Sequence, residues 1–114
     1  MSAKILIVAE HLDGKLNAST ARCVTCAREI KPDAVDVLVL ADAPAAVAAE
    51  AAKIDGVSRV LTVANAANAH ALAVVYAPQI AAVAKNGYTH VFAPSTTFGK
   101  DVTPRVAALL GVAQ

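Results

Sequence analysis

The sequence is poor in aromatic and charged residues. It has no tryptophan, two tyrosines and two phenylalanines, and charged residues make up only 17% of its 114 residues. The net charge of +1 gives no reason to expect nucleic acid or an anionic membrane surface as a partner. No apolar run approaches the roughly 18 residues that a membrane-spanning helix needs, so we expect no membrane insertion.

Targeting and metal-binding signals are also missing. The opening residues, MSAKILIVAE, carry one lysine and a very short apolar run before an acidic residue. This order does not fit a secretory signal peptide, and the segment is not rich in arginine and serine like a transit peptide. We therefore expect a cytoplasmic protein. The histidines (His11, His70 and His90) are scattered, without the ligand spacing of a zinc site, so we expect no metal.

The sequence does contain a regular alternation of strand-like and helix-like segments. Continuous apolar runs are typical of strands that are buried on both faces of a parallel sheet. The alternation predicts a single α/β domain over residues 1–114, a three-layer α/β/α fold of the Rossmann-like class. The expected strands are 4–10, 34–41, 58–64 and 88–94. The expected helices run from a cap at Asn17 or Ser19 to about Ile30, then over 43–54, 68–86 and 101–111, with a kink or break at Pro78.

The turn after the fourth strand has some features of a phosphate site. A P-loop reads G-x-x-x-x-G-K-[ST]. Here Gly99 and Lys100 supply the G-K, but Pro94 stands in place of the first glycine and Asp101 in place of the hydroxyl residue, so the match fails. One interpretation is a plain strand-to-helix turn in which Asp101 is the N-cap and Pro104 falls in the first helical turn. Contact with a ligand or partner is the alternative.

Ligands of parallel α/β sheets bind beyond the carboxyl ends of the strands, where this turn and the loop at residues 11–17 lie. The loop also contains an Asp-Gly turn signal. The hydroxyl groups of the turn have no visible base partner, so we predict no catalytic residue and no enzyme. We interpret Lys53, Arg59 and Lys85 as ordinary solvated charges. The candidate residues for a ligand or partner edge are His11, Ser95, Thr97, Gly99, Lys100 and Asp101.

Two further residue patterns are interpreted as structural. Cys23 and Cys26 lie about two turns into the first helix, whereas a thioredoxin-like pair lies at a helix N-terminus. With Ala27 and Ile30 they follow the i, i+3, i+4, i+7 pattern of one buried helix face, so core packing is favoured. His90 lies in the expected fourth strand and is interpreted as a buried structural histidine.

Three segments resemble one known family. They are KILIVAEHLDGKLN (4–17), AAEAAKIDGVSRVL (48–61) and YTHVFAPSTTFGKDVTPRVAALLGV (88–112). These segments are similar to the N-terminal domain of the electron transfer flavoprotein alpha subunit. The most specific parts are AEH-x-DGKLN and APSTTFGKD-x-x-PRVAALL. The resemblance covers essentially the whole chain, and the start without a presequence resembles bacterial members.

The resemblance implies an electron carrier subunit. In this family the alpha subunit pairs with a beta subunit, and the heterodimer with one FAD passes electrons from dehydrogenases to a membrane quinone reductase of the respiratory chain. The FAD site lies in a C-terminal domain, so no cofactor-binding residue and no cofactor are expected in this chain. The chain is then a truncated N-terminal scaffold domain. The alternative is a stand-alone domain that binds an adenine nucleotide or another small ligand.

The resemblance also implies a sheet order. The family domain resembles adenine nucleotide hydrolase-like folds, with the strand order 3-2-1-4-5. The sequence stops directly after the fourth helix, so we expect the order 3-2-1-4 with strand 5 missing. The fourth strand would then present an unpaired apolar edge, which is a template for pairing with another chain. We therefore expect self-association or pairing through this edge, or marginal stability.

Overall fold

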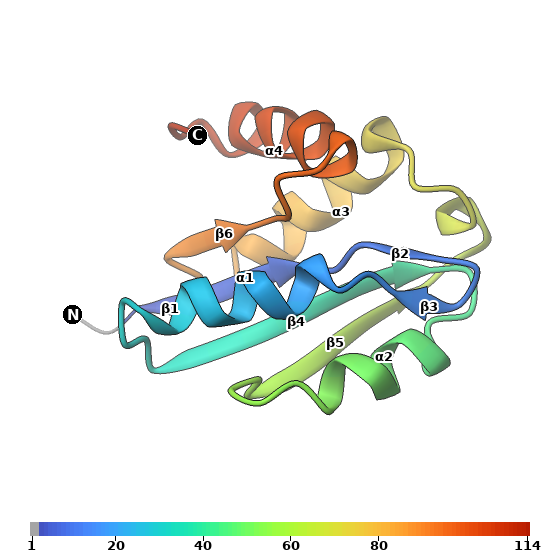
Figure 1. Cartoon of the computed structure of the whole chain (residues 1–114). Coiled ribbons are helices and arrows are strands. Elements are labelled where there is room, and N and C mark those ends of the chain that lie inside the picture. The colour runs from blue at the N-terminus through green and yellow to red at the C-terminus, as the bar shows by residue number, and fades with distance from the viewer. Residues whose placement is uncertain (1–2) are drawn as a thin grey trace.

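The main sheet has four parallel strands. The computed structural model describes residues 3–114 (Figure 1). Counted along the chain, the sheet strands lie in the order third, second, first and fourth, so the predicted order 3-2-1-4 is confirmed. Across the sheet the strands are β5 (Arg59–Ala64), β4 (Ala34–Ala41), β1 (Lys4–Val8) and β6 (His90–Phe92).

Helices cover both faces of this sheet, which confirms the α/β/α class. Helices α1 (Ser19–Arg28) and α2 (Ala45–Ala52) pack on one face. Helices α3 (Ala73–Ala84) and α4 (Thr97–Leu110) pack on the other face (Figure 1). The β5-to-β6 connection therefore passes over the sheet on the face opposite α1 and α2.

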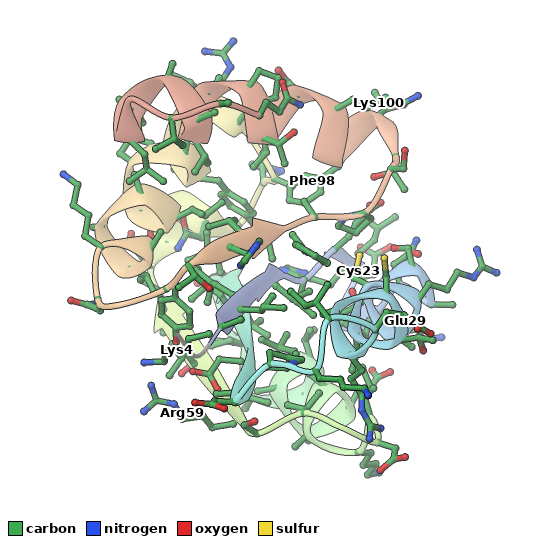
Figure 2. All side chains as sticks on the ribbon, turned by 90° about the vertical axis from the view of Figure 1, so that its left-hand side faces the viewer. Lys4, Cys23, Glu29, Arg59, Phe98 and Lys100 are labelled. Atoms are coloured by element: carbon green, nitrogen blue, oxygen red, sulfur yellow. The ribbon has the colours of Figure 1, made fainter. Side chains whose placement is uncertain are left out.

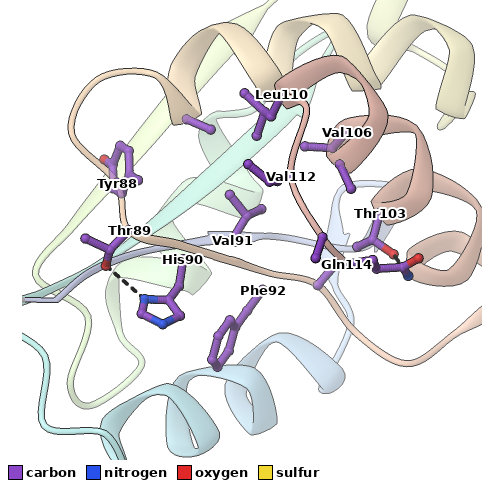
Figure 3. A pocket seen from close by; sticks show the side chains of 14 residues that line it. Tyr88, Thr89, His90, Val91, Phe92, Thr103, Val106, Leu110, Val112 and Gln114 are labelled. Atoms are coloured by element: carbon purple, nitrogen blue, oxygen red, sulfur yellow. Dashed lines mark hydrogen bonds between the residues drawn. The ribbon is translucent and has the colours of Figure 1, made fainter.

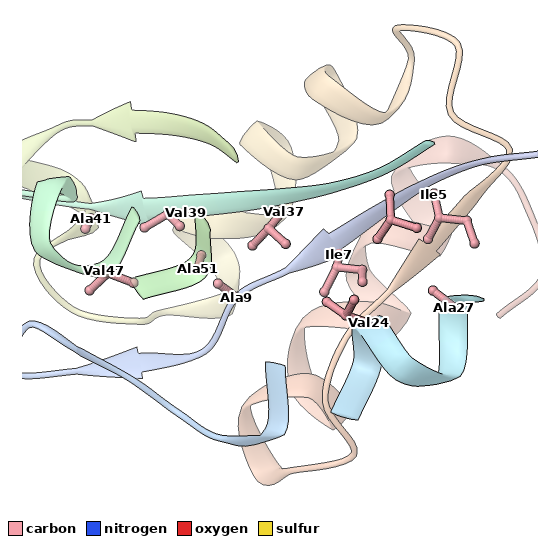
Figure 4. Packing of buried hydrophobic residues seen from close by; sticks show 11 residues of the cluster. Ile5, Ile7, Ala9, Val24, Ala27, Val37, Val39, Ala41, Val47 and Ala51 are labelled. Carbon is pink, nitrogen blue, oxygen red and sulfur yellow. The ribbon is translucent and has the colours of Figure 1, made fainter. Parts of the chain in front are cut away.

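The core is built on the two central strands, β1 and β4. Both are buried from the two sides, which explains why their sequences are continuous apolar runs. Side chains alternate along β1, so that Ile5 and Ile7 pack on the α1 side while Leu6 and Val8 pack on the α3 side. Figure 4 shows Ile7 beside Val24 and Ile5 nearer to Ala27, both on the side of the sheet that α1 covers. Small alanine side chains let the helices lie close to the sheet.

The expected loop at residues 11–17 is a β-hairpin. Strands β2 (His11–Leu12) and β3 (Lys15–Leu16) pair antiparallel across a two-residue turn. Asp13 and Gly14 both have positive φ, 52° and 75°. A two-residue hairpin of the I′ type requires this conformation at both positions, and Asp-Gly is among the pairs that adopt it most easily. The Asp-Gly turn signal is therefore confirmed.

Helix α3 begins later than predicted. Residues Ala66–Asn68 form a separate 3-10 turn, η1, capped by the side chain of Asn65, and α3 starts only at Ala73. The helix then continues through Pro78, so a break at this residue is wrong. Proline removes one backbone donor and leaves the carbonyl of Val74 without its helical partner. Val74 is 65% exposed, so the break in the hydrogen-bond pattern lies on a turn of α3 that faces solvent.

The predicted buried face of the first helix is right at Ala27 and wrong at Cys26 and Ile30. Cys26 and Ile30 are exposed, and Cys23 is only partly buried. The buried residues of α1 are Thr20, Val24 and Ala27. These also follow i, i+4, i+7 spacing, and the Thr20 hydroxyl accepts a hydrogen bond from the backbone of the segment after β1. The buried face of α1 thus includes the polar residue Thr20, while Cys23 packs on the core only in part.

His90 is exposed, so its interpretation as a buried histidine is wrong. It pairs in register with Ile5 on β6, which is the outermost strand on its side of the sheet. No helix among residues 3–114 covers it there, and its Nδ1 hydrogen-bonds the hydroxyl of Thr89 at 2.8 Å. The pattern of β6 resembled a central strand, but the strand lies at an edge.

Candidate functional site at the carboxyl edge of the sheet

Two loops meet beyond the carboxyl ends of β1 and β6. From β1 the chain continues to α1 on one face, and from β6 it continues to α4 on the other face. Adjacent strands that lead to opposite faces form the switch point at which ligands of this fold class bind. We call this place the carboxyl edge: residues 9–17 after β1 and residues 93–101 after β6.

A hydrogen bond between side chains closes the carboxyl edge. The Glu10 carboxylate Oε1 accepts a hydrogen bond of 2.5 Å from the hydroxyl of Thr96. The same hydroxyl oxygen accepts a hydrogen bond from the backbone N–H of Gly99 at 3.2 Å, and so caps α4. Glu10 therefore brings negative charge to the positive end of the α4 dipole. An anionic ligand would have to displace this carboxylate, which disfavours phosphate at this helix terminus.

The predicted cap of the fourth helix is wrong. Thr96 is the N-cap and α4 begins at Thr97, so Asp101 is a helical residue one turn further on. Asp101 instead forms an exposed i,i+4 ion pair with Arg105, with 3.5 Å between Oδ1 and Nε. Pro104 lies in the helix interior and not in its first turn. Thr96 and Asp101 are both good caps by residue type, and the Glu10 contact favours Thr96.

Gly99 is a packing residue. It is buried in the first turn of α4, and a Cβ atom at this position would lie 1.7 Å from the backbone carbonyl oxygen of Pro94. The helix can therefore approach the end of β6 this closely only with glycine. Its neighbours point in opposite directions: Phe98 packs edge-on against Tyr76, with 5.9 Å between ring centroids, and Lys100 points outward (Figure 2).

His11 is tied to a different strand from the turn after β6. Its Nε2 donates to the carbonyl oxygen of Leu40 at 2.7 Å, which requires a proton on Nε2. The Tyr76 hydroxyl donates to the same oxygen at 2.8 Å. In β4 the Leu38 carbonyl bonds the chain of β1, but β1 has ended at the level of Leu40. The two side chains replace the missing strand partner.

The structure thus does not gather the six candidate residues into one site. His11 contacts β4, whereas the turn contacts Glu10, the sequence neighbour of His11 in the segment that follows β1. Four candidates are exposed on the outside of the carboxyl edge: Ser95, Thr97, Lys100 and Asp101. These four can contact a partner, while His11 and Gly99 hold the local structure.

A charged cluster at the opposite edge of the sheet was missed. Asp36 on β4 is 0% exposed, and its Oδ2 accepts hydrogen bonds from Arg59 Nε at 3.0 Å and from the Tyr88 hydroxyl at 2.6 Å. The Lys4 ammonium lies 4.5 Å from the centre of the Tyr88 ring. Burial, and then the Asp36 hydrogen bond, raise the pKa of Tyr88. Arg59 is therefore an ion-pair partner and not an ordinary solvated charge. The sequence does contain a signal for this cluster, because an aspartate within an apolar strand needs a polar partner when it is buried.

A groove runs along the open side of β6 (Figure 3). Its volume is 570 Å³, and the residues that line it come from β6, from α4 and from the segment after α4. Val91, Val106, Leu110 and Val112 give it an apolar wall. Over residues 3–114, no group of three or more metal-ligating side chains is found, and no helix is long and apolar enough to cross a bilayer.

Comparisons with known proteins agree with the fold. The chain matches the electron transfer flavoprotein domain over residues 5–114. It is 52% identical over 110 residues to the electron transfer flavoprotein subunit alpha of Pseudomonas aeruginosa, covering 96% of this chain and 35% of that protein. It is 41% identical to the subunit alpha of Paracoccus denitrificans, covering 95% and 34%, and 36% identical to the mitochondrial subunit alpha of Dictyostelium discoideum, covering 96% and 32%. The chain thus spans about a third of the length of these relatives. It belongs to the electron transfer flavoprotein family, as an alpha-subunit domain.

Proposed function

We propose that this domain is the scaffold part of an electron transfer flavoprotein alpha subunit, which pairs with a beta subunit and supports a separate domain that holds FAD. The observation that carries the proposal is the match over 96% of this chain to a relative of which it covers only 35%. The complete bacterial, cytoplasmic complex would take electrons from dehydrogenases and pass them to a membrane quinone reductase. This domain would hold neither the flavin nor a catalytic residue.

The carboxyl edge supports a scaffold role. The place where this fold class binds ligands is filled by the hydrogen bond from Thr96 to Glu10, and the glycine of the turn serves helix packing. The exposed surface of the carboxyl edge is polar and includes Ser95, Lys100 and Asp101. Such a surface suits contact with a partner protein or a neighbouring domain better than capture of a phosphate.

Co-purification with a beta subunit from the same organism tests the pairing. We expect a stable complex that Lys100→Glu weakens, because the charge of an exposed residue at the carboxyl edge is reversed. Lys53→Glu is the matched control, since Lys53 is also exposed but follows α2. Failure to bind the beta subunit, or equal weakening by both variants, would contradict the proposed interface.

Ligand titration tests the scaffold role separately. The purified chain should be colourless, without flavin absorption near about 450 nm, and should not bind FAD, AMP or ATP at micromolar concentration. Stoichiometric yellow colour would show that this domain holds the flavin itself. Micromolar AMP or ATP binding that Lys100→Ala weakens and Lys53→Ala does not would favour the small-ligand alternative.

A further inference from the structure

Two thiols are accessible on one helix of this domain. Cys26 is exposed, and Cys23, one turn earlier on α1, is partly exposed and partly packed on the core (Figure 2). Residues three apart on a helix face the same side, whereas residues two apart do not. The two thiols therefore lie on the same side of the helix, and neither side chain is fully buried in the core.

The spacing of the pair is compatible with a bond between the two sulfur atoms. With a rise of about 1.5 Å and a radius of about 2.3 Å, Cα atoms at i and i+3 of an α-helix lie about 5 Å apart. Disulfides span roughly 4.4–6.8 Å between Cα atoms. The Cβ atoms of such a pair lie about 5–6 Å apart, while a disulfide needs about 3.5–4.5 Å. Closure therefore requires a small local adjustment of the helix.

The end of α1 can provide this adjustment. Beyond Cys26 the backbone bonds run from i to i+3, from Glu29 N to Cys26 O at 3.2 Å and from Lys31 N to Arg28 O at 2.9 Å. Cys26 thus lies in the last turn of α1, where the hydrogen-bond pattern changes before the helix ends at Arg28, and Lys31 has a positive φ of 50°. A disulfide formed against residual strain is more easily reduced than a structural disulfide.

We propose that Cys23 and Cys26 form a reversible redox pair, which hydrogen peroxide or another peroxide oxidises to a disulfide within α1. The Cys26 thiolate attacks one peroxide oxygen, so that an S–O bond forms, the O–O bond breaks and Cys26 becomes a sulfenic acid. The Cys23 thiol, as its thiolate, then attacks the Cys26 sulfur, the S–S bond forms and the S–O bond breaks. Overall, two thiols and one peroxide give one disulfide and two waters.

The environments of the two sulfurs assign these roles. Cys26 is the exposed thiol and meets the oxidant first. Burial, and then the charge of Cys26, raise the pKa of Cys23, so Cys23 stays a thiol to higher pH. Cys23 is therefore the resolving cysteine, which reacts only after Cys26 has been oxidised. The inference concerns this chain alone and does not depend on the proposed beta-subunit pairing.

The test treats the folded chain with a stoichiometric amount of hydrogen peroxide and follows the intact mass. We expect the loss of two hydrogen atoms, no thiol left for alkylation after unfolding, no disulfide-linked dimer, and full reversal by dithiothreitol. Circular dichroism before and after treatment verifies that the chain is folded. A sulfinic acid on Cys26 beside an unmodified Cys23, or a disulfide-linked dimer as the main product, would overturn the proposal.

A register variant separates the i,i+3 geometry from the mere presence of two thiols. The double variant Cys26→Ser with Thr25→Cys keeps two cysteines on α1, and Thr25 is exposed like Cys26. Its thiols lie two residues apart and face different sides, so we expect about tenfold less internal disulfide at the same peroxide dose. The single variants Cys23→Ser and Cys26→Ser should form none. Equal disulfide yield in the register variant would also overturn the proposal.

Discussion

The Thr96 hydroxyl donates a hydrogen bond to the Glu10 carboxylate, and these two residues come from opposite ends of the chain. Glu10 follows the first strand of the sheet, and Thr96 follows the last strand and caps α4. One side-chain contact thus joins neighbouring strands at their carboxyl ends and sets where α4 begins. It also fills the position at which related folds bind ligands.

Replacing Thr96 should destabilise the domain. Thr96→Ala removes the α4 cap, for which about 0.5–2 kcal/mol is typical, and deprives Glu10 of a charge-assisted hydrogen bond worth about 1.5–3 kcal/mol. Because Glu10 is only partly buried, water offsets part of the second effect. We expect a loss of about 2 kcal/mol in the free energy of unfolding, measured by urea denaturation. The control Thr97→Ala, at an exposed neighbour, should stay within about 0.5 kcal/mol of the parent.

Gly99→Ala should be more harmful than alanine at an open glycine. The added Cβ would meet the Pro94 carbonyl oxygen, and both atoms belong to the backbone or are fixed to it, so α4 must move away from the strand. Overpacking of this kind costs about 1–3 kcal/mol or more. Gly111→Ala is the control: no atom lies within 4 Å of its Cβ position, and only its positive φ of 68° adds about 1–2 kcal/mol. A larger melting-temperature loss for Gly111→Ala would contradict the close approach at Gly99.

The stability of the domain should fall in alkaline solution because of its two tyrosines. Burial raises the pKa of Tyr76, and burial together with the Asp36 hydrogen bond raises the pKa of Tyr88. Such a group stabilises the fold fully below its unfolded pKa of about 10, and this contribution is lost as the pH rises through the folded value. Urea denaturation over roughly pH 8–11 should show this fall. Tyr88→Phe should make it shallower, and an unchanged slope would contradict the role of Tyr88.

The two central strands were predicted well because burial on both faces requires a continuous apolar run in the sequence. The second strand was predicted at 34–41 and lies at Ala34–Ala41, since every position from Val35 onward is buried. Strand order came from the family resemblance and not from the hydrophobic pattern. Helix positions were less reliable. For the first helix, the spacing of Cys26 and Ile30 was as regular as that of the residues that are buried in α1, and only packing against the sheet decides between them.

The contacts of the carboxyl edge could not be predicted from local patterns. Thr96 and Asp101 have similar capping propensity, and the choice between them depends on Glu10, which is 86 residues away from Thr96 in the sequence. The same is true of the partnership between Asp36 and Arg59, which is set by the β4–β5 register. The sequence therefore shows which positions are polar, but the role of each position depends on contacts between residues that are far apart in the sequence.

The open side of β6 leads to a prediction about association. Among the described residues, β6 pairs only with β1, and the groove along its other side has an apolar wall. Unpaired strand edges pair readily with other chains, and a lysine at the edge blocks this. We expect the isolated chain to self-associate as its concentration rises, measured by multi-angle light scattering.

Val112→Lys, at a groove residue that is 59% exposed, should shift the chain toward monomer. Val74→Lys, at a residue that is 65% exposed on α3 and not part of the groove wall, is the matched control and should not. A monomer of the parent chain at all concentrations, with a melting temperature that does not depend on concentration, would show that the β6 edge is protected.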